Sequence, residues 1–133
     1  MRTLLIIGSL PENKIKETLY NEIKIFFNLN FEVIFTPIDT KNFKGNDKER
    51  YKLAFEKVKI ADLIIAETSD LSIGLGMEIR ESVILNKKLI VIAKKGTKVS
   101  GLIKGSPNLK ELIFYENILD LIEKLKNSLG KKY

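Results

Sequence analysis

Residues 61–83 constrain the fold of this chain more than any other segment, because three different patterns follow one another there without a break. An apolar run after Asp62 predicts a buried strand. A polar turn with two glycines comes next, and a segment with helical periodicity follows it. We therefore predict a strand, a loop and a helix, with Asp62 at the entry of the strand.

The loop of this unit has the chemistry of an anion site. Ser72, Gly74 and Gly76 crowd a turn where the backbone can approach a ligand closely, and free N–H groups at the start of a helix favour an anion. Glu78 is expected in the first turn of that helix, where the positive end of the helix dipole favours its ionised form. A carboxylate held beside an anion pocket is a candidate nucleophile. A helix cap, turn glycines and an ordinary first-turn Glu are the simpler interpretation of the same residues.

The composition limits the available chemistry. The 133 residues include no Cys and no His. Disulfides, thiolate nucleophiles and zinc–thiolate sites are therefore excluded, and the commonest general base is missing. Any catalysis then rests on carboxylates, hydroxyls, Lys, Arg, Tyr and backbone dipoles. No cluster of hard oxygen ligands indicates a metal, and the sequence implies no cofactor.

Length and charge limit the classes of protein to which the chain can belong. A chain of 133 residues is expected to form one domain, residues 1–133, around a single core. Its apolar runs are too short to span a bilayer and no signal peptide is evident, so we expect a cytoplasmic protein without a membrane partner. The net charge of +6 invites a nucleic-acid partner. The lysines, however, are spread along the chain rather than clustered with aromatic residues, so we expect none.

Apolar runs and helical periodicity alternate along the rest of the chain. Strands are predicted over residues 3–7, 31–35, 88–93 and 112–115, and helices over about 12–28, from 47 onward and from 118 onward. The sequence predicts a mobile loop near the site at residues 36–46 and a basic loop at residues 94–105. Such alternation predicts an α/β three-layer sandwich of the flavodoxin or Rossmann-like type, with a five-stranded parallel sheet in the order 2-1-3-4-5.

This topology also predicts where a ligand binds. In an open parallel sheet the ligand crevice lies at the carboxyl ends of the strands, where the strand order reverses. Gly8 and Ser9 follow the first strand at that place, and the loop of residues 70–76 follows the third. Two independent loop signals therefore converge on one crevice.

Several short motifs stand in a fixed order along the chain. They are Gly8-Ser9, an Ala-Asp pair at 61–62 opening a strand that ends in Ala-Glu, Ser-x-Gly-x-Gly-x-Glu at 72–78, a Lys-bearing turn and strand from residue 86, and Ser-x-x-Ile-Lys-Gly at 100–105. Together they resemble the nucleoside 2-deoxyribosyltransferase superfamily and, within it, the 2'-deoxynucleoside 5'-phosphate N-hydrolases. The ordered set covers much of the chain, whereas a Gly-x-Gly alone would carry little weight.

The resemblance implies roles for particular residues. Glu78 would attack the anomeric carbon of a 2-deoxyribose and expel the base, and water would hydrolyse the glycosyl-enzyme. A 5'-phosphate would sit against Ser9, Ser72 and the Gly74 to Gly76 amides. A homodimer is also implied, in which Ser100 reaches across the interface to the same phosphate.

Two further positions in the motifs are candidates for substrate contact. Gly8 is one, because it opens the turn after the first strand. Asp62 is the other, although capping of the preceding helix or pairing with Lys59 is the simpler and favoured interpretation of that residue. The implied ligand is a small-molecule nucleotide.

Three positions depart from that family's pattern. Leu5 stands where a Tyr is common, Pro11 replaces an Arg that helps to hold phosphate, and Ala54 replaces an Asp that orients the nucleophile and assists the base. Asp47 and Tyr51, earlier on the same predicted helix, are the candidates to replace that Asp through water.

These departures leave three hypotheses. The first is a hydrolase of (deoxy)nucleoside 5'-monophosphates with Glu78 as the nucleophile. The second is a nucleotide-binding or sensing protein of the same fold that has lost turnover. The third is a deoxyribosyltransferase, in which a second base intercepts the glycosyl-enzyme faster than water does.

Overall fold

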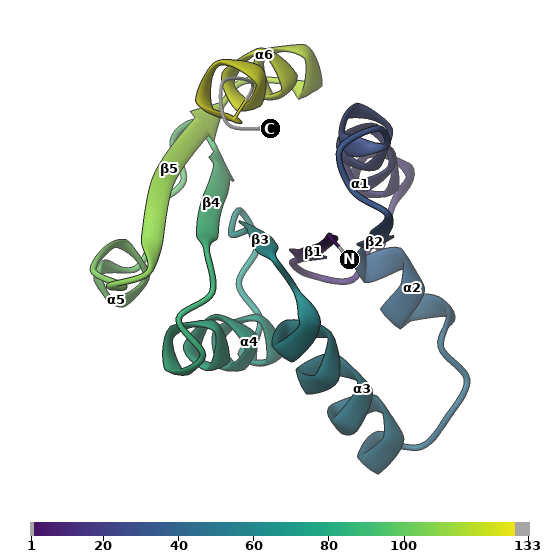
Figure 1. The fold of residues 1–133 in the computed structure, drawn as a ribbon. Helices are drawn as coiled ribbons and strands as arrows, with labels where there is room; N and C mark the ends of the chain where they lie inside the picture. Colours follow the sequence, from purple (N-terminus) through teal and green to yellow (C-terminus); the bar gives the residue numbers. More distant parts are fainter. Residues whose placement is uncertain (1, 130–133) are drawn as a thin grey trace.

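The computed structural model describes residues 2–129 and arranges them in three layers around one sheet (Figure 1). The strands are β1 (Thr3–Ile7), β2 (Val33–Phe35), β3 (Leu63–Glu67), β4 (Leu89–Lys94) and β5 (Leu109–Tyr115). All pair in parallel, in the order β2-β1-β3-β4-β5. The predicted α/β architecture and strand order are confirmed.

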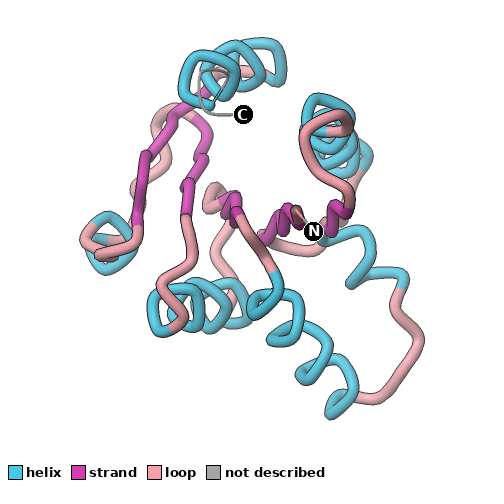
Figure 2. Tube along the Cα trace, viewed as in Figure 1, coloured by secondary structure: helices cyan, strands magenta, loops and turns pink. Residues whose placement is uncertain are grey.

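Helices cover both faces of the sheet, as Figure 2 shows in the same view. On one face lie α1 (Lys14–Phe27) and α6 (Ile118–Leu129). On the other lie α3 (Asp47–Ile60), α4 (Ile73–Ile84) and the short α5 (Gly101–Lys104), and α2 (Pro37–Asn42) follows the edge strand β2. No helix within residues 2–129 has the length and apolar character needed to cross a bilayer.

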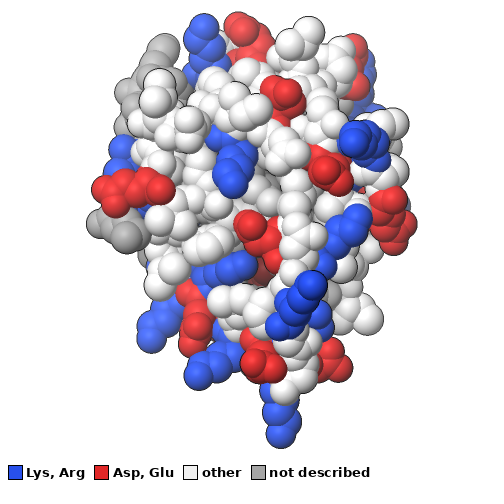
Figure 3. Space-filling view, turned by 90° about the vertical axis from the view of Figure 1, so that its right-hand side faces the viewer, with Lys and Arg blue, Asp and Glu red and all other residues white. Residues whose placement is uncertain are grey.

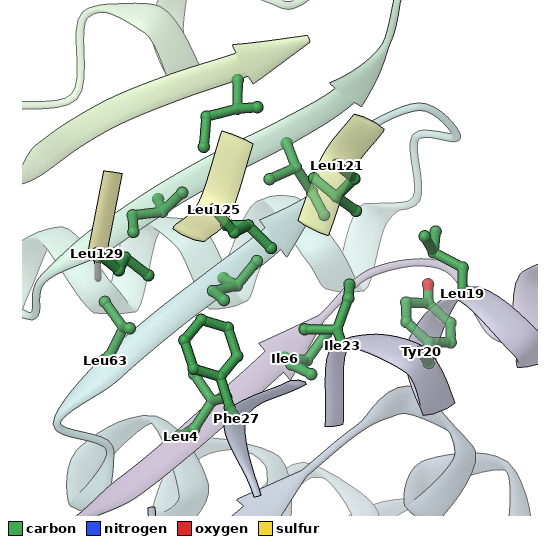
Figure 4. Packing of buried hydrophobic residues seen from close by; sticks show 14 of the residues in the cluster. Leu4, Ile6, Leu19, Tyr20, Ile23, Phe27, Leu63, Leu121, Leu125 and Leu129 are labelled. Carbon is green, nitrogen blue, oxygen red and sulfur yellow. The ribbon is translucent and has the colours of Figure 1, made fainter. Parts of the chain in front are cut away.

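Alternate residues of the central strands supply two separate apolar clusters. Leu4 and Ile6 of β1 belong to the cluster on the side of α1 and α6, where Figure 4 shows Phe27 beside Leu4 and Ile23 beside Ile6. Leu5 and Ile7 face the opposite way, toward Val58 of α3 and Leu75 and Ile79 of α4. A strand that is buried on both faces needs an unbroken apolar run, which explains why β1 reads as one.

The loop predicted over residues 36–46 contains helix α2, and this part of the prediction is wrong. Thr36 is the N-cap: its hydroxyl accepts from the Ile38 amide (3.2 Å), and Asp39 accepts from the Thr36 amide in return (2.8 Å). Pro37 occupies the first turn, where its fixed φ suits a helix. The basic loop of residues 94–105 likewise ends in α5, which Ser100 caps. Both helices are too short to leave a periodic pattern.

Strand β5 forms a free edge of the sheet and starts earlier than predicted, at Leu109. The carbonyl of Tyr115 accepts from the Lys95 amide on the side of β4 (2.8 Å). Neighbouring residues of a parallel strand direct their backbone groups to opposite sides, so the Phe114 carbonyl faces the free edge. Lys124 of α6 donates to that carbonyl (2.7 Å).

Figure 3 shows the face on which β2 and helices α1 to α3 lie, with basic and acidic side chains interspersed. A nucleic-acid surface needs a continuous basic stripe that follows the phosphates. This face carries side chains of both charges.

A buried carboxylate joins four elements near the carboxyl end of the sheet. Glu67, the last residue of β3, has no exposed surface. Its Oε1 accepts from the Ser69 amide (2.5 Å) and lies 3.7 Å from the Lys16 ammonium of α1, while its Oε2 accepts from the Tyr115 hydroxyl. The same ammonium lies 3.0 Å from Asp70. The loop after β3 is therefore fastened to both α1 and β5.

The turn after β1 is held in a similar way. The Tyr20 hydroxyl of α1 donates to the Ser9 carbonyl (2.7 Å). Burial, with the nearby Glu67 charge, raises the pKa of Tyr20, and burial and the bond to Glu67 raise that of Tyr115. Both hydroxyls therefore stay protonated and act as donors at neutral pH.

Gly8→Ala tests whether this turn tolerates a side chain. A Cβ at Gly8 would lie 2.5 Å from the Tyr20 hydroxyl oxygen and 3.3 Å from Cβ of Glu67. The hydroxyl must then move and weaken its bond to Ser9, so we expect a loss of about 1–3 kcal/mol in the free energy of unfolding in urea.

Gly76→Ala is the matched control for this experiment. A Cβ at Gly76 meets nothing within 4 Å, and Ala favours a helix by about 1 kcal/mol over Gly. Stability should hold or rise. A similar loss in both variants would mean that the turn after β1 is not crowded.

Candidate active site

A cavity of about 290 Å³ opens at the carboxyl ends of β1 and β2, on the face covered by α3 and α4. Four segments supply its wall: β1 with its turn (Leu5, Ile6, Ile7, Gly8, Leu10), the start of α2 (Thr36, Pro37, Thr40), α3 (Ala54, Lys57) and α4 (Ser72, Gly74, Leu75, Glu78). The cavity lies beside the point where the strand order reverses, which is where the topology predicts a ligand. Its volume is near the lower end of ligand pockets, about 300–1,000 Å³.

Helix α4 begins earlier than the sequence pattern predicts. Ser72 is its N-cap, with the hydroxyl oxygen accepting from the Leu75 amide (3.2 Å), and Ile73 is its first residue. Gly74 and Gly76 therefore lie within the first turn of the helix and not in the loop before it. Glu78 falls in the second turn rather than the first, which corrects the sequence-based placement.

Burial raises the pKa of Glu78 from its ordinary value near 4.5 to about 7, and the nearby positive charge of Lys57 opposes part of that rise. The expectation that the helix dipole favours the ionised form is overturned. The dipole acts mainly within the first turn, which Glu78 has left. Loss of water around a half-buried carboxylate is the larger effect. Near neutral pH the group is therefore poised between its two states.

Lys57 is a functional candidate that sequence reasoning missed. It lies on the inner face of α3 and is only 8% exposed. Its ammonium lies 4.6 Å from the centre of the Phe35 ring, and the residue lines the cavity together with Glu78. The available signal was position alone, since Lys57 follows Ala54 by three residues on the side of the helix that packs inward.

The structure brings some of the predicted site residues together and leaves others apart. Gly8, Ser72, Gly74 and Glu78 line the cavity. Ser9 lies between two lining residues, with its carbonyl bound to Tyr20. Gly76 is on α4 but outside the cavity wall.

Asp62 and Ser100 lie elsewhere. Asp62 is at the opposite end of β3, where its Oδ2 accepts from the Thr3 amide (2.7 Å) and ties β3 to β1. Ser100 caps α5, with its hydroxyl accepting from the Leu102 amide (3.3 Å). Neither residue lines the cavity of its own chain.

The positions that depart from the expected motif lie mostly at the cavity. Leu5 and Ala54 line it, whereas Pro11 is buried outside its wall. Neither proposed substitute for the missing Asp lines it: Asp47 pairs with Arg50 at 3.3 Å, and Tyr51 packs its ring 4.5 Å from that of Phe55. Residues 2–129 hold no group of three or more acidic side chains arranged for a metal ion.

Comparison with solved structures identifies proteins of similar fold. Clostridium botulinum CMP N-glycosidase BcmB matches with a TM-score of 0.77 and 18% identity, over 95% of this chain and 98% of that chain. A 2-deoxyribosyltransferase from the psychrotolerant bacterium Bacillus psychrosaccharolyticus matches with a TM-score of 0.68 and 16% identity, over 90% of each chain. A conserved protein from Enterococcus faecalis matches with a TM-score of 0.60 and 16% identity, over 96% of this chain and 98% of that chain.

At these identities the likeness is one of fold. The fold that the sequence motifs implied is therefore confirmed, because a 2-deoxyribosyltransferase and a nucleotide N-glycosidase share it. Neither a protein-family model nor a curated protein matches the chain.

The shifted pKa of Glu78 predicts a pH-dependent stability. An unfolded Glu titrates near 4.5 and the folded Glu78 at about 7, so between these pH values the folded state holds more protons and the free energy of unfolding falls as pH rises. Glu78→Gln removes this loss. We expect the variant to be more stable than the parent by about 2–3 kcal/mol at pH 8, and equal to it below pH about 4.5, in urea unfolding.

Glu56→Gln is the matched control, since Glu56 is exposed on α3 and lies outside the cavity. It should leave the pH dependence of stability unchanged. A Glu78→Gln variant whose stability follows that of the parent at every pH would contradict the burial of this carboxylate.

Proposed function

We propose that this protein hydrolyses the N-glycosidic bond of (deoxy)nucleoside 5'-monophosphates, with Glu78 as the nucleophile. One observation carries the proposal: the Glu78 carboxylate, whose pKa is about 7, lines the same cavity as the first residues of α4. The start of a helix favours an anion such as a phosphate. A carboxylate one turn further along the helix is then suitably placed to reach the sugar to which that phosphate is attached.

The chemistry follows from the electronic demands of the bond. An oxygen of Glu78 attacks C1' of the sugar as the bond to the base breaks, and the bonding electrons leave with the base. The carboxylate stabilises the positive charge that develops on the sugar. Water then attacks the glycosyl ester, releases the sugar 5-phosphate and restores the carboxylate.

The phosphate subsite would use hydroxyls and amides. The oxygen of Ser72 accepts from the Leu75 amide, so its hydroxyl proton is left to donate. A Cβ at Gly74 would meet nothing within 4 Å, which leaves the helix start open to a ligand. The Ser72 hydroxyl and the first amides of α4 would then donate to one anion.

Two observations bear on the choice between the hydrolase and the alternative functions. The solved structures of similar fold are named as a CMP N-glycosidase and a 2-deoxyribosyltransferase, which supports chemistry at a nucleoside glycosidic bond. Ala54 favours the second candidate, a nucleotide sensor without turnover, since Glu78 is the one carboxylate among the described residues that line the cavity.

Base release tests the proposal. We expect the protein to release free base from a panel of deoxynucleoside and nucleoside 5'-monophosphates, followed by chromatography, with kcat/KM rising through pH about 7 as Glu78 ionises. Glu78→Gln should lower release by at least about 1,000-fold, because the nucleophile is gone. The control Glu56→Gln should retain full activity.

Each alternative predicts a different result. Equal release by the parent and Glu78→Gln would rule out the proposed nucleophile. Nucleotide binding without any release would favour the sensor. Transfer of the sugar to an added second base, faster than to water, would favour the transferase.

A second copy of the chain is part of the proposal. Ser100 lies outside the cavity of its own chain, so it can meet a bound phosphate only from a partner. The outer face of α4 exposes Ile73, Met77 and Ile84, and the adjoining α5 exposes Leu102. Such an apolar surface beside Ser100 suits a homodimer contact.

Mixing two variants tests the shared site. Ser100→Ala should raise KM for the monophosphate, and Glu78→Gln should abolish turnover. A mixed dimer of the two holds one site with Glu78 and the partner's Ser100, so the mixture should show lower KM than Ser100→Ala alone. A monomeric mass in analytical ultracentrifugation, or a mixture that behaves as the sum of its parts, would rule out the dimeric site.

A further inference from the structure

Lys57 carries a charge that the rest of the protein does not satisfy. The residue is 8% exposed, and among the described residues its ammonium has no hydrogen-bond acceptor and no carboxylate within 4 Å. Its neighbour is the face of the Phe35 ring, 4.6 Å from the ring centre. The Nζ atom of Lys57 is not among the fully buried polar atoms that lack a partner. The ammonium therefore keeps contact with solvent in the cavity, and its three N–H donors are available to a ligand there.

The Lys57 ammonium also acts on the Glu78 carboxylate. Both residues line the cavity, Lys57 from α3 and Glu78 from α4. The positive charge of Lys57 lowers the pKa of Glu78, in opposition to burial. Among the described residues the two groups form no ion pair within 4 Å, and both border the cavity, so a ligand bound there can contact both.

We propose that Lys57 is a catalytic residue that donates a hydrogen bond to the departing base. The proposal rests on the proposed function and names the group that assists the leaving base. As Glu78 attacks C1', the C1'–N bond breaks and its electron pair moves onto the base, where the ammonium stabilises the new negative charge. Lys57 passes a proton to the base and recovers one from water, and the remaining hydroxide equivalent ends on C1'.

The acceptor on the base is defined by its chemistry. It must lie close to the glycosidic nitrogen, because both Glu78 and Lys57 border the same cavity. O2 of a pyrimidine and N3 of a purine are each two bonds from that nitrogen. A developing charge on either atom is what an ammonium stabilises more strongly in the transition state than in the ground state.

The alternative is that Lys57 binds the phosphate. A phosphate carries its charge throughout the reaction, so such a contact would lower KM and leave the leaving group unaffected. The start of α4 already offers amide donors near Gly74, one turn before Glu78. A leaving-group comparison separates the two roles.

The experiment compares Lys57→Met and Lys57→Arg with the parent on two kinds of substrate. One kind is the natural deoxynucleoside 5'-monophosphates, both pyrimidine and purine. The other is 4-nitrophenyl 2-deoxyribose 5-phosphate, whose nitrophenolate leaves without a proton donor. Lys57→Met should lower kcat for the natural substrates by about 100-fold or more and for the nitrophenyl substrate by less than about 5-fold. Lys57→Arg should recover part of the loss.

Lys59→Met is the matched control, because Lys59 lies on the same helix and is exposed. It should match the parent on both substrates. A larger loss with pyrimidine substrates would identify O2 as the acceptor, and a larger loss with purines N3. Equal losses by Lys57→Met on natural and nitrophenyl substrates would overturn the proposal, as would a rise in KM alone.

A second measurement separates failure of this proposal from failure of the proposed function. Titration of the Glu78 side-chain carboxyl carbon by NMR should show a higher pKa in Lys57→Met than in the parent, whether or not turnover occurs. An unchanged pKa would overturn the proximity of the two groups. If the parent releases no base and no nitrophenolate, the proposed function and the role of Lys57 both fall. If the parent is active and Lys57→Met has the same activity, only the proposed role of Lys57 falls.

Discussion

The Glu67 carboxylate, which water cannot reach, imposes the arrangement on which the cavity depends. A buried charge costs several kcal/mol unless donors surround it, and here the Ser69 amide, the Tyr115 hydroxyl and the Lys16 ammonium do so. Those donors come from the loop after β3, from β5 and from α1. Few conformations of the loop after β3 allow these donors to reach the carboxylate. The loop leads directly into α4, so contacts made with α1, on the other face of the sheet, help to fix where α4 starts and where Glu78 points.

The fold treats the buried Glu67 and the half-buried Glu78 in opposite ways. Glu67 receives hydrogen bonds on both oxygens. Glu78 is half-buried beside an apolar wall, with the Lys57 charge nearby, and its pKa rises to about 7. The first arrangement stabilises the fold. The second costs stability at neutral pH, and such a cost is usual where a group is kept reactive rather than satisfied.

Sequence reasoning predicted the sheet and four of the residues that line the cavity, Gly8, Ser72, Gly74 and Glu78, because both leave local signatures. The strands are unbroken apolar runs, the crossover rule orders them, and Glu78 and Ser72 stand in one short motif. Helix α2 was missed because it has only six residues, and its signals are confined to its start, in the Thr36 and Asp39 capping pair and Pro37. Lys57 was not predicted as a site residue because a lysine on an amphipathic helix is normally a surface residue. The direction of the Glu78 pKa could not be predicted, since the helix dipole and burial act in opposite senses and only packing decides between them.

The bond from Lys124 to the Phe114 carbonyl has a consequence for assembly. An exposed sheet border is a template onto which another chain can add its own strand, and unchecked addition leads to fibres. An incoming strand would have to displace a charged donor from α6 before it could pair at that carbonyl. Growth by sheet extension is thereby disfavoured at β5.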